Sequence, residues 1–364
     1  MSDNTSKEKD SENDQIAVAC PNCFCDQGLQ LDAEKIGSNI AHTCPNCGSK
    51  SSKMLTKDML DELVYRFFTW GSLRRYNYGA APRIIYNTHQ KTSIKMTPSL
   101  ERDVKIFERI LGVGFFYYGP RAWMYGQITP LEALQNSNSR PQVIDRILRE
   151  YPTVILTANE APFYRVRKAP SAPHDYSQYD SPPKAFLGKG RLDTTDLPIL
   201  YASPDLEVCV HECRVTVEDE LYVATLIPTK SLRLINLAAL LKEDRHVTEF
   251  ESLDLAVHML FMASSHSYEI TREISIAART AGFDGIIYPS YFSMARHGGM
   301  PCQAVVYGIS NRRIPQFQQH EEAITVQNLA LFGYPIRDEK IAIKCINKVT
   351  LTRVSYNFLF GPLS

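Results

Sequence analysis

The sequence predicts an α+β protein in which a cysteine-rich ribbon and a small helical domain precede a larger mixed domain. Two Cys-Pro-Asn-Cys motifs lie near the N-terminus, apolar residues then recur at helical spacing, and short strand-like runs follow Pro152. These three observations divide the chain into five parts. We expect a disordered tail at 1–17, a zinc ribbon at 18–55, a helical domain at 56–151, an α+β domain at 152–320 and a C-terminal β extension at 321–364.

The composition is typical of a globular protein, and the formal net charge of the chain is zero. Its 364 residues are 44% hydrophobic, which is enough for more than one core, and 40 basic side chains balance 40 acidic ones. Net charge therefore selects neither nucleic acid nor membrane, and nucleic-acid binding by the ribbon stays open. No apolar run reaches the ~20 residues of a membrane span, and no signal peptide precedes the ribbon, so we expect a cytoplasmic protein.

The N-terminal cysteines predict a structural zinc site. Five of the nine cysteines fall in the first fifty residues, which fits a metal site in a reducing compartment better than a disulfide framework. Two Cys-x-x-Cys knuckles at ribbon spacing supply four thiolates for a tetrahedral site: Cys20, Cys23, Cys44 and Cys47. Cys25 and His42 lie close enough in the sequence to compete as ligands. A redox pair is the alternative, but such a motif normally occurs once, at a helix start.

Apolar stripes with helical period predict the small helical domain. They run over Leu60–Phe68 before Gly71, over Leu100–Leu111 before Gly112, and over Val143–Leu148 before Pro152. A further short helix begins at Thr129-Pro130. The aromatic and glycine-rich segment between Gly114 and Gly126 is expected to be buried loop that fills the core.

The pattern changes after Pro152 to short strands mixed with helices. The segment 169–183 holds four prolines, so we expect a surface excursion beside the site that acts as a lid. Alternating apolar residues in 341–346 and 349–354 predict a C-terminal hairpin. Strands are expected at 153–156, 163–166, 200–201, 221–226, 232–235, 285–288 and 304–307, with helices near 205–216, 253–265 and 270–281.

The stretch from Gly188 to Glu212 holds the main candidate site residues. Glycines flanking Lys189 let the backbone approach a ligand, and the planar fork of Arg191 suits phosphate oxygens. The strand-like run 198–202 then leads into a helix capped by Ser203-Pro204-Asp205. Glu212 lies beside the apolar stripe of that helix rather than within it. Each of these residues taken singly is typical of an exposed surface, so the inference depends on their order and spacing.

The order and spacing resemble the RES domain, whose members look like ADP-ribosyltransferases and consume NAD. The chain departs from the family pattern at Asp193, where the family usually has asparagine. It departs again at Met300-Pro301-Cys302, which displace the polar residue expected after the late glycine pair. The matching segments are Phe163–Val166, Gly190-Arg191, Leu200–Ala202, the helix ending at Glu212, Gly285–Ser290, and Gly298-Gly299 downstream of Arg296.

The resemblance assigns roles that the chemistry of NAD cleavage requires. Breaking the nicotinamide–ribose bond develops positive charge on the sugar, and Glu212 would stabilise it. Arg191 and the backbone at Gly190 would hold the pyrophosphate, with Arg165 as a second cation. Tyr201 would stack on the nicotinamide ring, and Ser290 would bind the substrate or orient a neighbouring side chain. A serine after Tyr-Pro is also good turn chemistry, so Ser290 keeps that alternative.

The helical domain resembles the HEPN-like domains that precede some RES domains. Arg83 and His89 meet the Arg-x4-6-His spacing of HEPN ribonucleases, in a segment that is not clearly helical. The leading expectation is a zinc-containing NAD glycohydrolase or phosphorylase that acts as a toxin or defence effector. The alternatives are an ADP-ribosyltransferase acting on a macromolecule, and an RNA-binding or RNA-cutting protein or interaction scaffold with an inactive RES-like domain. Expected partners are NAD, a helical antitoxin or a self-inhibitory N-terminal region, and a second copy of the chain.

Overall fold

The computed structural model describes residues 16–40, 42–293, 305–306 and 309–363, and these form two compact units. The first unit comprises Met1–Arg75, Ala80–Pro120 and Tyr356–Ser364, and the second comprises Tyr76–Gly79 and Arg121–Ser355. The division therefore falls near residue 120 and not at the expected boundary of 151. The predicted helices at 129 and 143–148 belong to the second unit.

The cysteine-rich part of the first unit combines short strand pairs with a helix. Strand β1 (Ala17–Ala19) pairs with β4 (Leu55–Thr56), and β2 (His42–Thr43) pairs with β3 (Lys50–Ser51). Helix α2 (Gln27–Ile36) lies between the two knuckles, and the side chain of Asp26 caps it by accepting a hydrogen bond from the Leu29 amide. The expected ribbon is thus a ribbon with an inserted helix.

The rest of the first unit is built on two amphipathic helices and a strand pair. Helix α3 (Lys57–Val64) continues into a π-helical turn, and α4 (Pro98–Leu111) ends at Gly112, whose φ of 70° favours glycine. Strand β7 (Ile84–Asn87) pairs with β8 (Gly114–Tyr117), so the start of the segment expected to be loop is a strand. Strands β5 (Leu73–Tyr76) and β6 (Gly79–Pro82) form a further pair, whose segment Tyr76–Gly79 belongs to the second unit. Phe68, Phe107 and Phe115 fill the core.

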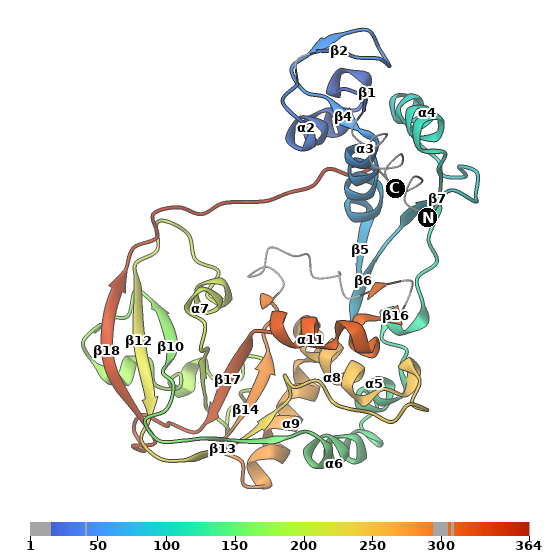
Figure 1. Cartoon of the computed structure of the whole chain (residues 1–364). Coiled ribbons are helices and arrows are strands. Elements are labelled where there is room, and N and C mark those ends of the chain that lie inside the picture. The colour runs from blue at the N-terminus through green and yellow to red at the C-terminus, as the bar shows by residue number, and fades with distance from the viewer. Residues whose placement is uncertain (1–15, 41, 294–304, 307–308, 364) are drawn as a thin grey trace, which may run out of the picture. The chain divides into compact units, whose positions relative to one another are not determined.

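The second unit contains a five-stranded sheet in the order β11-β17-β14-β13-β9. Figure 1 labels three of these strands, β17, β14 and β13. Only β13 and β14 run parallel, and the other neighbours are antiparallel. The alternating or continuous apolar pattern of each strand agrees with its buried position. The strands are β9 (Thr153–Leu156), β11 (Ile199–Ala202), β13 (Leu232–Asn236), β14 (Gly285–Pro289) and β17 (Gln327–Phe332).

A three-stranded antiparallel sheet in the order β10-β12-β18 adjoins the first sheet. It consists of β10 (Phe163–Lys168), β12 (Leu221–Pro228) and β18 (Ile341–Val349). The two sheets are joined by an isolated bridge between Tyr164 and Ser203. The C-terminal hairpin prediction is therefore wrong, because β18 pairs with β12 and the described residues 350–363 contain no strand. The expected boundary at 320 also divides the core, since β17 and β18 complete these sheets.

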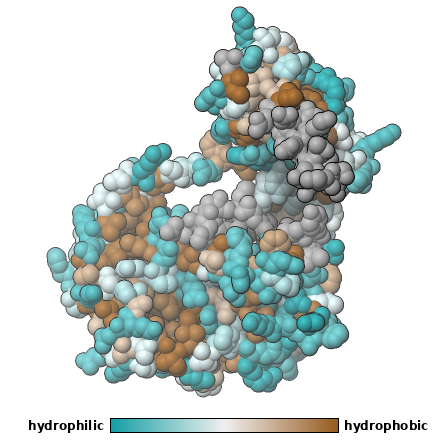
Figure 2. All heavy atoms as spheres, in the orientation of Figure 1, coloured by the Kyte–Doolittle hydropathy of each residue, from teal (hydrophilic) through white to brown (hydrophobic). Residues whose placement is uncertain are grey.

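The helices of the second unit lie near the positions predicted from the sequence, except for α11 (Pro315–Ile324), which was not predicted. Helices α8 and α9 pack against β14, and α7 packs on the face of β10 that carries Tyr164 and Val166. In the face shown by Figure 2, apolar side chains are prominent over the part that holds α7 and the three-stranded sheet. The helices are α5 (Thr129–Gln135), α6 (Arg140–Glu150), α7 (Leu206–Glu212), α8 (Leu253–Met262), α9 (Tyr268–Thr280) and α11 (Pro315–Ile324).

Two shorter features complete the described chain. Strand β15 (Val305–Val306) pairs with β16 (Ile309–Ser310), in the region where a strand was expected at 304–307. The segment 169–183 contains only one 3-10 turn, Tyr176–Tyr179, as its proline content predicted. Among the described residues, no helix combines the length and apolar character that crossing a bilayer requires.

Candidate active site

A helix-borne carboxylate held by two buried donors is the centre of the candidate site. Glu212 is the last residue of α7, a helix whose first turn is capped by Asp205. Its Oε1 accepts hydrogen bonds from Ser290 Oγ at 2.8 Å and from Asn328 Nδ2 at 2.7 Å. Both donors are almost completely buried, whereas the Glu212 side chain is exposed. Because both bonds reach the same oxygen, Oε2 is left without a donor among the described residues.

Neighbouring strands of the five-stranded sheet bring the two donors together. Strands β14 and β17 are antiparallel, with Tyr288 opposite Asn328, and Ser290 directly follows β14. Ser290 Oγ also accepts a hydrogen bond from the Phe292 amide at 3.1 Å. Ser290 therefore shapes a turn and orients Glu212 at the same time, so the two interpretations of this serine are compatible.

Arg191 is fixed in place at the C-terminal end of α8. Its guanidinium donates to the carbonyl of Leu260 at 3.2 Å and to that of Ala263 at 2.8 Å. The Tyr268 ring lies 4.9 Å from its central carbon, which is a cation–π distance. Helix C-terminal carbonyls carry partial negative charge, so this is a favourable place for a cation. The remaining N–H groups of Arg191 have no protein partner among the described residues.

Tyr201 and Asp193 clamp the glycine-containing loop that carries Arg191. The Tyr201 hydroxyl donates to Asp193 Oδ1 at 2.9 Å and accepts from the amides of Leu192 and Asp193. Asp193 Oδ2 accepts from the Gly188 amide at 2.6 Å. Gly190 fits inside this clamp because a Cβ there would lie 2.8 Å from the Tyr201 oxygen and even closer to Asp193. Asp193, which stands where the RES family usually has asparagine, is thus a buried carboxylate that holds the loop in place.

Helix α9 holds the same loop from the other side, through residues that the sequence reasoning missed. Arg272 donates to the carbonyls of Gly188 at 2.7 Å and Gly190 at 2.8 Å, and Thr271 Oγ1 donates to the Arg191 carbonyl at 2.6 Å. Nothing in the local sequence marks these two residues, because their partners lie about eighty positions away. Asn328 was also missed. A polar residue inside the apolar run 327–332 was its only signal, since a buried amide needs a partner.

The buried phenol of Tyr288 is close enough to both Glu212 and Arg191 for their charges to affect its pKa. Burial raises the pKa of its phenol above the ordinary value, the negative charge of Glu212 raises it further, and the positive charge of Arg191 lowers it. Burial likewise raises the pKa of Tyr201 well above its ordinary value, with smaller contributions from Tyr288 and Asp193. The structure therefore brings Arg191, Tyr201, Glu212 and Ser290 into one neighbourhood.

Arg165 lies deeper than the other predicted residues. Its side chain is 6% exposed and donates to the carbonyls of Tyr201 at 2.7 Å and Asp180 at 3.0 Å. Burial lowers the pKa of this guanidinium to about 10. In this position it supports the backbone of β11. The predicted Arg296, Gly298-Gly299 and Met300–Cys302 lie outside the described residues.

The four predicted metal ligands form one cluster in the first unit. Their sulfur atoms all lie within 4.8 Å of one another, with Cys20 and Cys47 at 3.6 Å and Cys23 and Cys44 at 3.5 Å. Thiolates around a tetrahedral zinc, each ~2.3 Å from the metal, are separated by distances of this size. Cys25 and His42 are outside the cluster and exposed.

Arg83 and His89 flank a strand and do not share a helix. Arg83 precedes β7 and is half-buried, while His89 follows it and is exposed. No described contact joins the two side chains.

The fold and the site define a two-sheet α+β domain with an anchored glutamate at the end of a helix. Residues 162–329, which form part of the second unit and less than half of the chain, match the RES domain family. No curated protein matches the chain. Among solved structures, it is similar to a chain of the M. tuberculosis MbcT–MbcA toxin–antitoxin complex, with 13% identity and a TM-score of 0.33. That match covers 61% of this chain and 94% of the other.

Proposed function

We propose that the second unit binds NAD and cleaves its nicotinamide–ribose bond. The observation that carries the proposal is the Glu212 carboxylate, which Ser290 and Asn328 hold through one oxygen while the other is open. The match of residues 162–329 to the RES domain family supports NAD as the substrate. A charge fixed before the reaction stabilises a developing opposite charge without reorganisation, which is the most effective form of electrostatic catalysis.

In the proposed reaction, the bond between ribose C1′ and the nicotinamide nitrogen breaks, and its electron pair leaves with nicotinamide. The positive charge that develops on the ribose faces the open Oε2 of Glu212. A new C1′–O bond then forms to water, to phosphate or to an acceptor group on a macromolecule, which loses a proton. Glu212 would stabilise the same transition state in all three cases.

The glycine-containing loop is the proposed binding place for the pyrophosphate. Arg191 is held by two carbonyls and by the Tyr268 ring, and its other N–H groups are available to phosphate oxygens. Tyr201 contributes by clamping the loop through its hydroxyl, and its ring remains the proposed partner of the nicotinamide ring. Arg165 contributes indirectly, because its donors are occupied by backbone carbonyls.

Product analysis tests the proposal and separates its three forms. Purified protein is incubated with NAD, with and without phosphate, and the products are identified by chromatography and mass spectrometry. ADP-ribose indicates hydrolysis, ADP-ribose 1″-phosphate indicates phosphorolysis, and a labelled macromolecule indicates transfer. Glu212→Gln keeps the shape and removes the charge, so we expect turnover to fall by ~10²-fold or more.

The matched control is Glu218→Gln, the same chemical change at an exposed position with no described hydrogen bond. We expect this variant to turn over NAD like the wild type. NAD consumption by a folded Glu212→Gln protein at the wild-type rate would show that the carboxylate assignment is wrong.

We also propose that Cys20, Cys23, Cys44 and Cys47 hold one structural zinc ion. The sulfur separations and the enclosure of Cys20 and Cys44 support this choice, because a closed four-thiolate site stabilises a fold and leaves no position open for substrate. Elemental analysis of protein purified without added metal should find about one zinc per chain.

We further propose that NAD loss makes the chain a toxin, restrained by an antitoxin or by its own first unit. The match to the RES domain family supports this role. Induced expression in a bacterial host should lower cellular NAD before growth stops, and Glu212→Gln should abolish both effects. Growth arrest by Glu212→Gln with NAD intact would contradict the proposal.

A further inference from the structure

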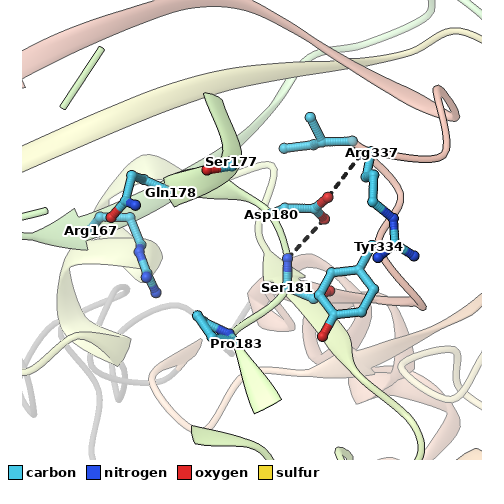
Figure 3. Close-up of a pocket in the computed structure, with 9 residues that line it drawn as sticks. Arg167, Ser177, Gln178, Asp180, Ser181, Pro183, Tyr334 and Arg337 are labelled. Atoms are coloured by element: carbon cyan, nitrogen blue, oxygen red, sulfur yellow. Dashed lines mark hydrogen bonds between the residues drawn. The ribbon is translucent and has the colours of Figure 1, made fainter. Parts of the chain in front are cut away.

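Apart from the candidate active site, the second unit has a pocket between the proline-rich segment 169–183 and the loop that follows β17. It encloses about 400 Å³, which is the size of a small-molecule site. Figure 3 shows Arg167 and Arg337 on opposite sides of the pocket, with Asp180 and Ser181 between them. The lining residues are Arg167, Ser177, Gln178, Asp180, Ser181, Pro183, Tyr334, Ile336 and Arg337.

Arg167 is a half-buried cation with no counter-ion. Among the described residues, no hydrogen bond or ion pair reaches its guanidinium. Burial lowers its pKa, which expresses the unfavourable energy of leaving this charge desolvated. Arg165 is two residues away on the same face of β10, and the charge of Arg167 helps to lower the Arg165 pKa. Neither guanidinium forms an ion pair with a carboxylate among the described residues, and the negative charge of Asp180 only partly offsets the burial of Arg165, so an anion would stabilise this pair of cations.

Asp180 supplies the carboxylate among the lining residues, and no described ion pair joins it to Arg167. Asp180 Oδ1 accepts from the Ser181 amide and Oδ2 accepts from the Arg337 amide, both at 2.8 Å. These bonds fix the carboxylate at the edge of the pocket, where its remaining lone pairs can accept from a hydroxyl or amino group of a ligand. On the opposite wall, the Arg337 guanidinium lies 4.3 Å from the centre of the Tyr334 ring, and its side chain is 67% exposed.

The pocket is separate from the candidate active site. Asn328, which contacts Glu212, is near the start of β17, whereas Tyr334 and Arg337 come after the end of that strand. The four residue steps from Asn328 to Phe332 alone span roughly 13 Å of extended strand. A ligand in the pocket and a substrate at Glu212 would therefore occupy opposite ends of β17.

We propose that this pocket binds a compact anionic ligand, whose phosphate or carboxylate group pairs with Arg167 and whose hydroxyl or amino group donates to Asp180. Arg337, whose Nε also pairs with Asp338 Oδ1 at 3.2 Å, provides a second cation at the entrance, and the Tyr334 ring and Pro183 provide apolar walls. The segment 169–183 then forms one wall of a binding site that is distinct from the candidate active site. The site goes beyond the proposed NAD cleavage and requires no turnover.

Calorimetric titration of the full chain tests the proposal. The probes are AMP, inorganic phosphate and malonate, with adenosine as the uncharged control. We expect at least one of the three anions to bind, and adenosine to bind more weakly than AMP. A preference for AMP or phosphate assigns a phosphate ligand, and a preference for malonate assigns a carboxylate ligand.

Arg167→Gln removes the charge and keeps most of the length, so binding should weaken by roughly tenfold or more, while Arg167→Lys should retain most of it. Arg279→Gln, an exposed arginine elsewhere in the second unit, is the matched control and should bind like the wild type. Arg337→Ala alters an exposed side chain that does not support the fold, and it should also weaken binding.

Three results would overturn the proposal. They are the absence of binding by all three anions, unchanged binding in a folded Arg167→Gln protein, and binding that is lost in Arg191→Ala but kept in Arg167→Gln. The last result would assign the anion to the candidate active site. Because these titrations measure binding without reaction, their failure is distinguishable from a failure of NAD cleavage.

Discussion

Asn328 offers a sharp test of the site because its side-chain amide donates to Glu212, beside the Tyr288 phenol whose pKa it also lowers. Its side-chain amide donates to Glu212 Oε1 at 2.7 Å from a buried position in β17. Asn328→Ala removes this bond and leaves Ser290 as the single described donor. We therefore expect the carboxylate to be less well oriented, and the turnover of NAD to fall.

The size of the effect follows from the hydrogen bond. A bond to a charged group contributes about 1.5–3 kcal/mol, and Glu212 is exposed on its other side, so we take the lower value. About 1.5 kcal/mol corresponds to roughly tenfold in turnover. The Michaelis constant should change much less, since Asn328 is buried beneath the carboxylate and the expected contacts to pyrophosphate come from Arg191.

The assay measures kcat and KM for NAD consumption in four proteins: wild type, Asn328→Ala, Glu212→Gln and the double variant. If Asn328 acts through Glu212, the double variant should be no slower than Glu212→Gln alone. Asn328→Asp is the complementary change. It places a second carboxylate against the first, so activity at neutral pH should fall and partly recover in acid, where the pair can share a proton.

Two results would refute this reasoning. Wild-type turnover by a folded Asn328→Ala protein would show that the hydrogen bond does not orient the carboxylate. Independent, additive losses in the double variant would show that Asn328 does not act through Glu212.

Three further predictions concern the fold. Cys23→Ser should lower the zinc content and the unfolding temperature of the protein. An unchanged unfolding temperature in metal-free protein would contradict a structural role for zinc. A chelator should leave NAD cleavage unchanged as long as the protein stays folded. Gly190→Ala should break the Tyr201–Asp193 clamp and lower both stability and turnover, while Gly119→Ala, with no atom within 4 Å of its added Cβ, should be near neutral by thermal unfolding. His258 has a pKa lowered to about 3 by burial and by Arg312, so only its unfolded form takes up a proton near pH 6.5. Protonation of His258 in the unfolded chain should therefore lower the free energy of unfolding, measured by urea titration, by about 1.4 kcal/mol between pH 7.5 and 5.5. His258→Gln should remove this contribution to the pH dependence.

The sequence by itself determined the local features of this protein. The two Cys-Pro-Asn-Cys motifs identified the four clustered cysteines, because each knuckle is a local turn. Helical periodicity and caps placed α4, α6, α8 and α9, and short β-branched runs placed most strands of the second unit. Order and spacing, through the resemblance to the RES domain, also predicted Arg191, Tyr201, Glu212 and Ser290 as site residues, and their role in a site stays a prediction.

The tertiary structure decided every feature that depends on distant partners. Asn328 reaches Glu212, and Arg272 reaches the Gly188–Asp193 loop, through strand pairing and helix packing that no local pattern encodes. The same limitation explains the wrong C-terminal hairpin: β18 has the alternation of any half-buried strand, and only the sheet shows that its neighbour is β12. Burial likewise distinguished two arginines of β10 that the sequence alone does not separate. Arg165 is buried and donates to backbone carbonyls, whereas Arg167 lines a pocket. Alternation along a strand places residues on a face, but the groups that meet that face come from elsewhere in the chain.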